Sequence, residues 1–330
     1  MEFSTHVTIS ESTFDFSYQD EIMLMGSCFA ENIGTKLNDA KFTVDVNPFG
    51  ILYNPASVAL SLKTLLHPAQ FSSDDLFEHE GLFHSFAHHS RFSSPSPEES
   101  SDKINRRLAV SAANLSKASR LVITFGTAFV YRLKSTGQIV SNCHKLPEKM
   151  FFREILSAEA ILTEWNTLFL SLWEQNPDVK ILFTVSPIRH WRDGAHTNQL
   201  SKATLLLAVD ALQRKYPERI GYFPAYEIMM DELRDYRFYA DDMLHPSSVA
   251  IEYIWECFTR HCLARESQVV LKEWQEIQKA MNHRPFQPQS KGYRQFISQT
   301  LLKAEQISRK FPSFDIVKEI ELLRSKADNI

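Results

Sequence analysis

Ile-Met-Leu-Met-Gly-Ser-Cys-Phe-Ala, residues 22–30, decides the fold: an apolar run stops at Gly26-Ser27, and a helix-like stretch follows. The run predicts a buried strand, and a glycine permits the backbone angles of a sharp turn that other residues resist. A helix over 28–40 would direct its N-terminal amides, which favour negative charge, at Ser27. This is one way to hold a serine nucleophile at the rim of a sheet, although such a serine is more often only a helix N-cap.

Short apolar runs alternate with longer segments of helical period outward from this turn. Strands that are apolar throughout are typical of a parallel sheet buried on both faces. The alternation predicts a three-layer α/β/α architecture with a mostly parallel central sheet, whose site would lie at the edge where the strands end. The predicted strands are 21–26, 120–125, 179–185 and 219–224, and the predicted helices are 28–40, 56–66, 101–118, 157–174, 198–215 and 247–265.

Three segments depart from this alternation. Residues 77–92 hold four His and four Phe and are expected to form a loop or hairpin near a pocket. Residues 129–141 indicate a second hairpin. From about 267 onward the chain is polar and of helical period, so we expect an α/β domain over 1–265 and a helical extension over 266–330 that packs against it. The extension is also a candidate surface for homo-oligomerisation.

Composition excludes several functional classes. The 330 residues are 44% hydrophobic and include 24 Phe, which is enough for a large core. The net charge of -4 and the lack of a basic stripe argue against nucleic acid as a partner. No apolar stretch approaches the roughly 18 residues that span a bilayer, and the N-terminus lacks the pattern of a secretory signal. With four scattered cysteines, the expectation is a reduced, cytoplasmic protein without a membrane association.

A second polar signal lies near the end of the α/β region. In Tyr239-Ala-Asp-Asp-Met-Leu-His245-Pro, Asp242 and His245 are three residues apart, just before a predicted helix. This spacing places a carboxylate and an imidazole on the same side of a turn. The carboxylate can hold the imidazole Nδ1 proton, and the free Nε2 can then accept a proton from a serine hydroxyl. The plainer reading is a capping aspartate beside an exposed histidine, and Asp241 is the nearest rival to Asp242.

Ser27 near the start and Asp-x-x-His near the end give the chain order of the triad in the SGNH/GDSL hydrolases, which this sequence resembles. Gly26-Ser27-Cys28-Phe29-Ala30 itself resembles the signature of the GSCFA-domain family, a bacterial branch of that superfamily. The resemblance covers roughly residues 20–265 and implies an SGNH-hydrolase-like, flavodoxin-like domain. It also implies Ser27 as nucleophile, His245 as general base and Asp242 as the group that orients it.

The resemblance further implies an oxyanion hole made by the amide of Ser27, a glycine amide from a second block and an asparagine side chain from a third. Asn-Pro-Phe-Gly at 47–50 resembles the second block, with Gly50 as the donor. The third block departs from the family pattern, because Gly-Thr-Ala-Phe at 126–129 holds no asparagine. Either Thr127 replaces it as a donor or Asn142 arrives from elsewhere. One missing donor would cost roughly 3 kcal/mol in the barrier.

Other polar residues have less specific signals. Arg189 and His190 follow the strand ending at 185 and are candidates for substrate contact, as is His144 beyond the second hairpin. The many histidines match no familiar metal-ligand spacing, so no metal is expected. Cys28 is a rival nucleophile, since a thiol at a helix N-terminus near a histidine can be activated.

These signals together predict a serine esterase that acts through an acyl-enzyme. By analogy with esterases of the superfamily, the resemblance implies a small-molecule acyl ester as substrate, such as an acylated carbohydrate or another small polar ester. No cofactor is expected. Two alternatives stay open at this point. The same triad would support acyl transfer to an alcohol instead of water, and the fold without a complete oxyanion hole would suit a non-catalytic binding protein.

Overall fold

The computed structural model contains a five-stranded sheet in the order β2-β1-β5-β9-β10, with every neighbouring pair parallel. The structure describes residues 5–9, 15–287, 289–311 and 314–328. In strand number along the sheet the order is 2-1-3-4-5, which is that of doubly wound flavodoxin-like folds. The strands of this sheet are β1 (Glu21–Gly26), β2 (Thr43–Val46), β5 (Arg120–Phe125), β9 (Lys180–Val185) and β10 (Ile220–Tyr222).

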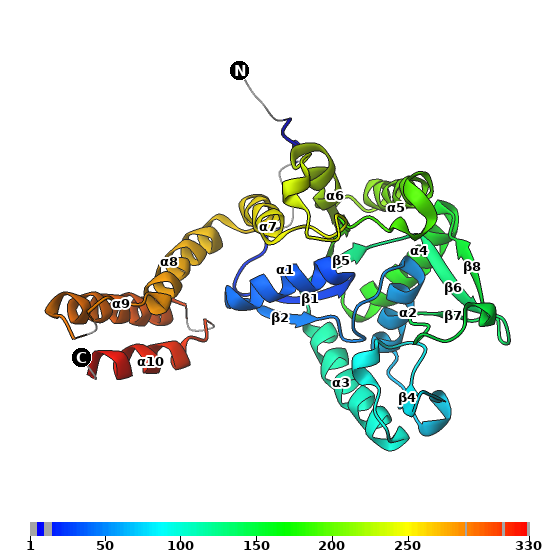
Figure 1. Ribbon diagram of the computed structural model, residues 1–330, viewed down its shortest axis with the longest axis horizontal. Helices are drawn as coiled ribbons and strands as arrows, with labels where there is room; N and C mark the ends of the chain where they lie inside the picture. The colour runs from blue at the N-terminus through cyan, green and yellow to red at the C-terminus, as the bar shows by residue number, and fades with distance from the viewer. Residues whose placement is uncertain (1–4, 10–14, 288, 312–313, 329–330) are drawn as a thin grey trace.

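Helices cover both faces of the sheet, so the predicted three-layer architecture is confirmed (Figure 1). One face packs on α1 (Cys28–Asp39) and α7 (Ser248–Cys262). The other face packs on the remaining crossover helices, which are α2 (Pro55–Leu66), α3 (Pro97–Lys117), α4 (Ala158–Gln175) and α5 (Gly194–Lys215). Along β1, Leu24 faces the first layer and Met23 the second, which explains why its sequence is apolar throughout.

Local side-chain chemistry fixes where the helices begin. Ser96 caps α3 and Pro97 takes its first position, so this helix starts earlier than the predicted residue 101. Asn54 and Pro55 start α2 in the same way. The short α6 (Ala225–Glu227) follows β10 and leads into the segment that carries Asp242 and His245.

Two small antiparallel sheets lie outside the central one. The histidine-rich segment forms a hairpin of β3 (Phe77–His79) and β4 (Leu82–His84), as expected. The second predicted hairpin pairs β6 (Phe129–Leu133) with β7 (Ile139–Val140) and is extended by β8 (Phe151–Ile155) into three strands.

The C-terminal helices α8 (Arg265–Asn282), α9 (Lys291–Lys310) and α10 (Val317–Asp328) extend beyond the β2 edge of the sheet (Figure 1). They share the hydrophobic cluster of the α1 face. Trp274 donates to the carbonyl of Asp39 at 2.9 Å, and Phe314 packs edge-on against Tyr18. The predicted packing against the α/β body is therefore present. None of the helices in the described residues is long and apolar enough to cross a membrane.

Candidate active site

The turn at Gly26-Ser27 lies where β1 ends and α1 begins, beside the end of β5. Gly26 has φ +135°, and a Cβ there would lie 2.1 Å from the carbonyl oxygen of Thr124. Its amide donates to Oδ1 of Asn47 at 2.9 Å. Only glycine meets both requirements, namely the backbone angle and the close approach of β5.

The Ser27 hydroxyl is the N-cap of α1 and accepts from the amide of Phe29 at 3.3 Å. The side chain therefore stands at the positive end of a 12-residue helix, where a developing negative charge is favoured. Ser27 is only 1% exposed, so it is almost completely buried.

Asp242 and His245 form the predicted pair. Oδ2 of Asp242 accepts from Nδ1 of His245 at 2.5 Å, while Oδ1 accepts from the amides of Leu244 and His245, each at 2.9 Å. The backbone amides of His245 and Leu244, together with the His245 ring, lower the pKa of Asp242 to about 2. The carboxylate is therefore charged at neutral pH and fixes the imidazole with Nε2 unbonded by any described residue.

Ser27 and His245 lie at the same edge of the sheet, but the structure does not join them. No hydrogen bond between the two side chains occurs in the described part of the chain, and the side chain of His245 is 52% exposed. His190 lies between the two segments. Its ring packs edge-on against Tyr53, and burial followed by the positive charges of Lys202 and His245 lowers the pKa of His190 to about 4.

The loop after β2 covers the ends of β1 and β5. The amide of Leu52 donates to the carbonyl of Gly26 at 2.8 Å. The carbonyl of Tyr53 accepts from the amides of Gly126 at 2.7 Å and of Thr127 at 2.9 Å. The second block of the sequence thus contacts Gly26 and the loop after β5 through backbone hydrogen bonds.

The predicted oxyanion donors are mostly engaged elsewhere. The amide of Ser27 donates to the carbonyl of Thr124 at 3.3 Å, and the amide of Gly50 donates to that of Asn47 at 2.8 Å. The hydroxyl of Thr127 bonds Ser201 at 3.0 Å and accepts from the amide of Phe129.

Asn142 and His144 belong to a different part of the molecule. Oδ1 of Asn142 accepts from the amide of His144 at 2.9 Å, and Nε2 of His144 bonds the carbonyl of Ser85 at 2.8 Å. Within the described residues, no contact joins either of them to Ser27. Arg189, by contrast, stands beside His190, with its guanidinium 4.8 Å from the ring centre of Trp191.

Asn47 is a buried amide that the sequence did not single out as a donor. It is 1% exposed, and its Oδ1 must face Gly26 because a backbone amide can only donate. Among the described residues, none forms a hydrogen bond with its Nδ2. An unpaired buried donor costs free energy and calls for an explanation. The signal that could have found it is its place in the same short block as Gly50.

The histidine-rich hairpin packs against this block without forming a metal site. His88 stacks on Phe49 with 4.5 Å between ring centres, and His84 lies 4.4 Å from His144. Among the described residues, no three histidine, cysteine or acidic side chains gather so as to hold a metal ion. Burial, with a further contribution from the charge of His144, lowers the pKa of His88 to about 3, and burial lowers that of His144 to about 4.

These two buried histidines predict a loss of stability in mild acid. Both bind protons more weakly in the folded state than in the unfolded state, so their contribution is complete above about pH 6.5 and is lost as the pH falls toward 4. At pH 5 we expect each to cost about 2 kcal/mol in the free energy of unfolding. Urea denaturation at pH 7 and pH 5 measures this cost.

The matched variants are His88→Phe, which keeps the ring on Phe49, and His67→Gln at an exposed position. His88→Phe should reduce the difference in stability between the two pH values by about 2 kcal/mol, with the remainder due to His144 and His190, whereas His67→Gln should keep all of it. An unchanged pH dependence in His88→Phe would contradict the assignment.

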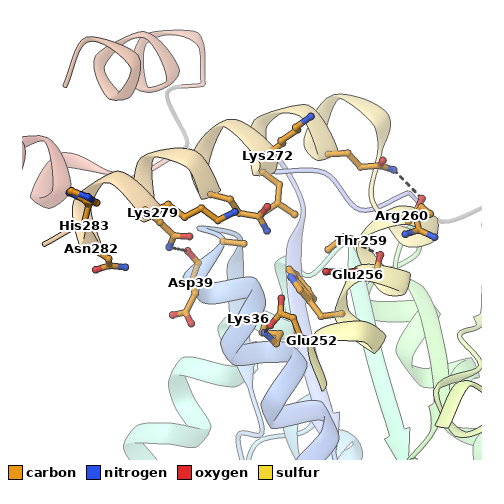
Figure 2. Close-up of a pocket in the computed structure, with 16 residues that line it drawn as sticks. Lys36, Asp39, Glu252, Glu256, Thr259, Arg260, Lys272, Lys279, Asn282 and His283 are labelled. Atoms are coloured by element: carbon orange, nitrogen blue, oxygen red, sulfur yellow. Dashed lines mark hydrogen bonds and ion pairs between the residues drawn. The ribbon is translucent and has the colours of Figure 1, made fainter. Parts of the chain in front are cut away.

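A hollow of about 1200 Å³ lies away from this site, at the opposite edge of the sheet (Figure 2). It is formed where α8 crosses the C-terminal ends of α1 and α7, and Lys36, Glu252 and Lys279 point into it. Lys36 and Glu252 pair with each other, so the hollow is lined by charges of both signs and holds none of the candidate catalytic residues.

Comparison with protein-family models shows to which family the chain belongs. A model of the GSCFA family matches residues 21–258, from β1 through most of α7. The chain belongs to the GSCFA family. A separate model, the C-terminal domain of GSCFA domain proteins, matches residues 274–329, which contain the second half of α8 and all of α9 and α10. Among curated proteins, no sequence matches at a significant level.

Proposed function

We propose that this GSCFA protein is a serine hydrolase of ester bonds, with Ser27 as nucleophile, His245 as general base and Asp242 as its orienting acid. The observation that carries the proposal is the Asp242–His245 hydrogen bond at 2.5 Å, at the same sheet edge as Ser27. In the reaction, Ser27 Oγ attacks the acyl carbon, and its proton passes to His245 Nε2. The proton then goes to the departing alcohol, and water releases the acyl group.

The reaction requires His245 to approach Ser27. The segment that carries it is a tight turn, in which the amide of Ala240 donates to the carbonyl of His245 at 2.8 Å. Asp242 and His245 are about half exposed and contact one another, so they can move as one unit toward the serine. Catalytic hydrogen bonds are commonly loose without substrate.

Two donors near the turn suit the oxyanion. The unpaired Nδ2 of Asn47 belongs to an amide whose Oδ1 already bonds Gly26. The amide of Cys28 is the first of α1 and faces the same N-terminal end as the serine hydroxyl. In this proposal, Asn47 replaces the asparagine missing from the third block as the oxyanion donor. Gly50 and Thr127 are not donors to the oxyanion but hold the surrounding loops through backbone hydrogen bonds.

The mouth of the site favours a polar ester with a sugar-like alcohol. Tyr53 is 40% and Trp191 48% exposed, and both flank His190. Exposed aromatic rings with one apolar face are suited to stack on the apolar face of a polar ring. Arg189 behind Trp191 adds a donor for a substrate oxygen.

Covalent labelling tests the proposal. A fluorophosphonate should attach to the wild-type protein at Ser27, as located by peptide mass, and should not label Ser27→Ala. Ser157→Ala is the matched control, since Ser157 caps α4 by accepting from the amide of Ala160 and is remote from the triad. It should label like the wild type. If well-folded wild type resists labelling, the result would favour a non-catalytic binding protein. The same alternative is supported by the amides of Ser27 and Gly50, which already donate to backbone carbonyls.

A further inference from the structure

Lys202, on α5, is a buried cation at the ends of β5 and β9 that the proposed mechanism does not use. Its side chain is 1% exposed. Nζ donates to the carbonyl of Gly126 at 2.7 Å and to that of Ser186 at 2.7 Å. These carbonyls stand just past β5 and β9, where the sheet ladder has ended. Lys202 therefore joins two adjacent strand ends.

Two backbone carbonyls do not need a charge to satisfy them. An amide side chain or a water would serve, whereas a cation without a counter-ion is costly to bury. Among the described residues, no carboxylate pairs with Lys202; its nearest neighbours are the two carbonyls and the ring of Tyr226, whose centre is 5.4 Å from Nζ. Because the buried ammonium of Lys202 has no counter-ion among the described residues, its role must extend beyond hydrogen bonding to these two carbonyls.

The charge acts on the proposed nucleophile turn. Burial is the main cause of the shifted pKa of both Lys202 and Cys28, the residue after Ser27, and beside it the positive charge of Lys202 lowers the pKa of Cys28. Its two acceptors also begin the loops of the site. Gly126 anchors Tyr53 through its amide, and Ser186 begins the loop that leads to His190. Moving Lys202 would therefore disturb both walls of the site at once.

We propose that Lys202 is a positioning residue of the proposed hydrolase, whose buried ammonium holds the ends of β5 and β9 together and supplies positive charge beside the Ser27–Cys28 turn. Negative charge would develop there when Ser27 attacks the acyl carbon. Preorganised positive charge in a site that excludes water favours such a transition state over the ground state. The inference rests on the proposed function.

The groups that face Lys202 are neutral near pH 7. Burial raises the pKa of Cys28 from α1 and of Tyr226 from α6, and burial lowers that of His190, from the loop after β9, to about 4. Ser201 and Asn198, on α5 itself, do not titrate. Burial lowers the pKa of Lys202 to about 7. Its charge is thus present below this pH and lost above it.

The experiment measures kcat and KM for a short-chain acyl ester from pH 5.5 to 9. If the charge of Lys202 raises kcat about tenfold, wild-type kcat should fall about fivefold between pH 7 and 9, because about half of the Lys202 side chains are already neutral at pH 7. This effect is smaller than the loss of a direct oxyanion donor because Lys202 acts at a distance. Lys202→Met should have a kcat about tenfold lower at pH 6.5, an unchanged KM and no fall at alkaline pH. Lys202→Arg, which stays charged, should recover part of kcat and show no alkaline fall.

The control is Lys215→Met, on the same helix but exposed, with Nζ bonded to Asn166 at 2.9 Å. It should reproduce the wild-type profile. A wild-type kcat that is flat from pH 7 to 9 would overturn the role of the charge, even if Lys202→Met fails to fold. Equal pH profiles in the wild type and Lys202→Met would overturn it as well, while leaving Ser27-dependent labelling intact. Hydrolysis that survives in Ser27→Ala would overturn the proposed function and the role of Lys202 together.

Discussion

Ser27→Ala is expected to lower kcat for ester hydrolysis by about four orders of magnitude or more, because the members of a nucleophile–base–acid unit act together. Without the hydroxyl no acyl-enzyme forms, and only the oxyanion donors and substrate binding remain. KM should change little, since Ser27 is 1% exposed and its hydroxyl adds little contact to the ground state. Steady-state kinetics on a short-chain ester measures both quantities.

The same measurement separates the three roles. His245→Ala should cost as much as Ser27→Ala, and the double variant should cost no more than either single one. Asp242→Asn should cost about 10⁴-fold, because the side-chain amide would turn a donor toward Nδ1 and favour the wrong tautomer of His245. If the losses in kcat of Ser27→Ala and His245→Ala were additive in the double variant, the two residues would not act as one catalytic unit.

Stability must be followed in parallel, because Ser27 also caps α1. Removal of a cap costs about 1 kcal/mol in the free energy of unfolding. Ser157→Ala removes a comparable cap from α4, so it should lose similar stability with full activity. A Ser157→Ala variant that loses activity together with stability would show that the effect at Ser27 is structural.

The central sheet was predictable because its inner strands are apolar on both faces. The bounds predicted for β1 and β5 agree with the structure, and β9 and β10 differ by one or two residues at their ends. The edge strand β2 was missed, since it has only four residues and its one buried residue is a charged one, Asp45, which pairs with Arg107. An edge strand of this kind has no local signal that separates it from a loop.

The residues of the candidate site also differ in whether the local sequence carries a signal for them. The sequence singled out Ser27, Asp242 and His245 as candidates because each lies in a short motif whose chemistry depends on near neighbours in the sequence. Asn47 and Lys202 were not singled out. Asn47 acts through Gly26, 21 residues away, and Lys202 binds Gly126, 76 residues away. A buried polar contact across that distance is set by strand order, which no local pattern contains.

Gly26→Ala is expected to destabilise the protein by more than about 4 kcal/mol, the size reserved for a severe steric or burial defect. The added Cβ would lie 2.1 Å from the carbonyl oxygen of Thr124 and 2.9 Å from its carbonyl carbon. Both atoms are backbone of the neighbouring central strand, so no side chain can turn aside. Relief requires β1 and β5 to separate at the end that carries Ser27.

Two glycines separate the causes of this effect. Gly81 has φ +75° with nothing within 4 Å of a Cβ, so Gly81→Ala carries backbone strain alone and should cost about 1 kcal/mol. Gly292, the second residue of α9, has neither strain nor a clash, and Gly292→Ala should stabilise by up to about 0.5 kcal/mol, less than in the middle of a helix. Urea denaturation of the three variants gives the comparison. A Gly26→Ala protein no less stable than Gly81→Ala would show that the strands accommodate the methyl group. In that case the glycine before Ser27 would be required by the backbone angle of the turn, and not by the closeness of β5.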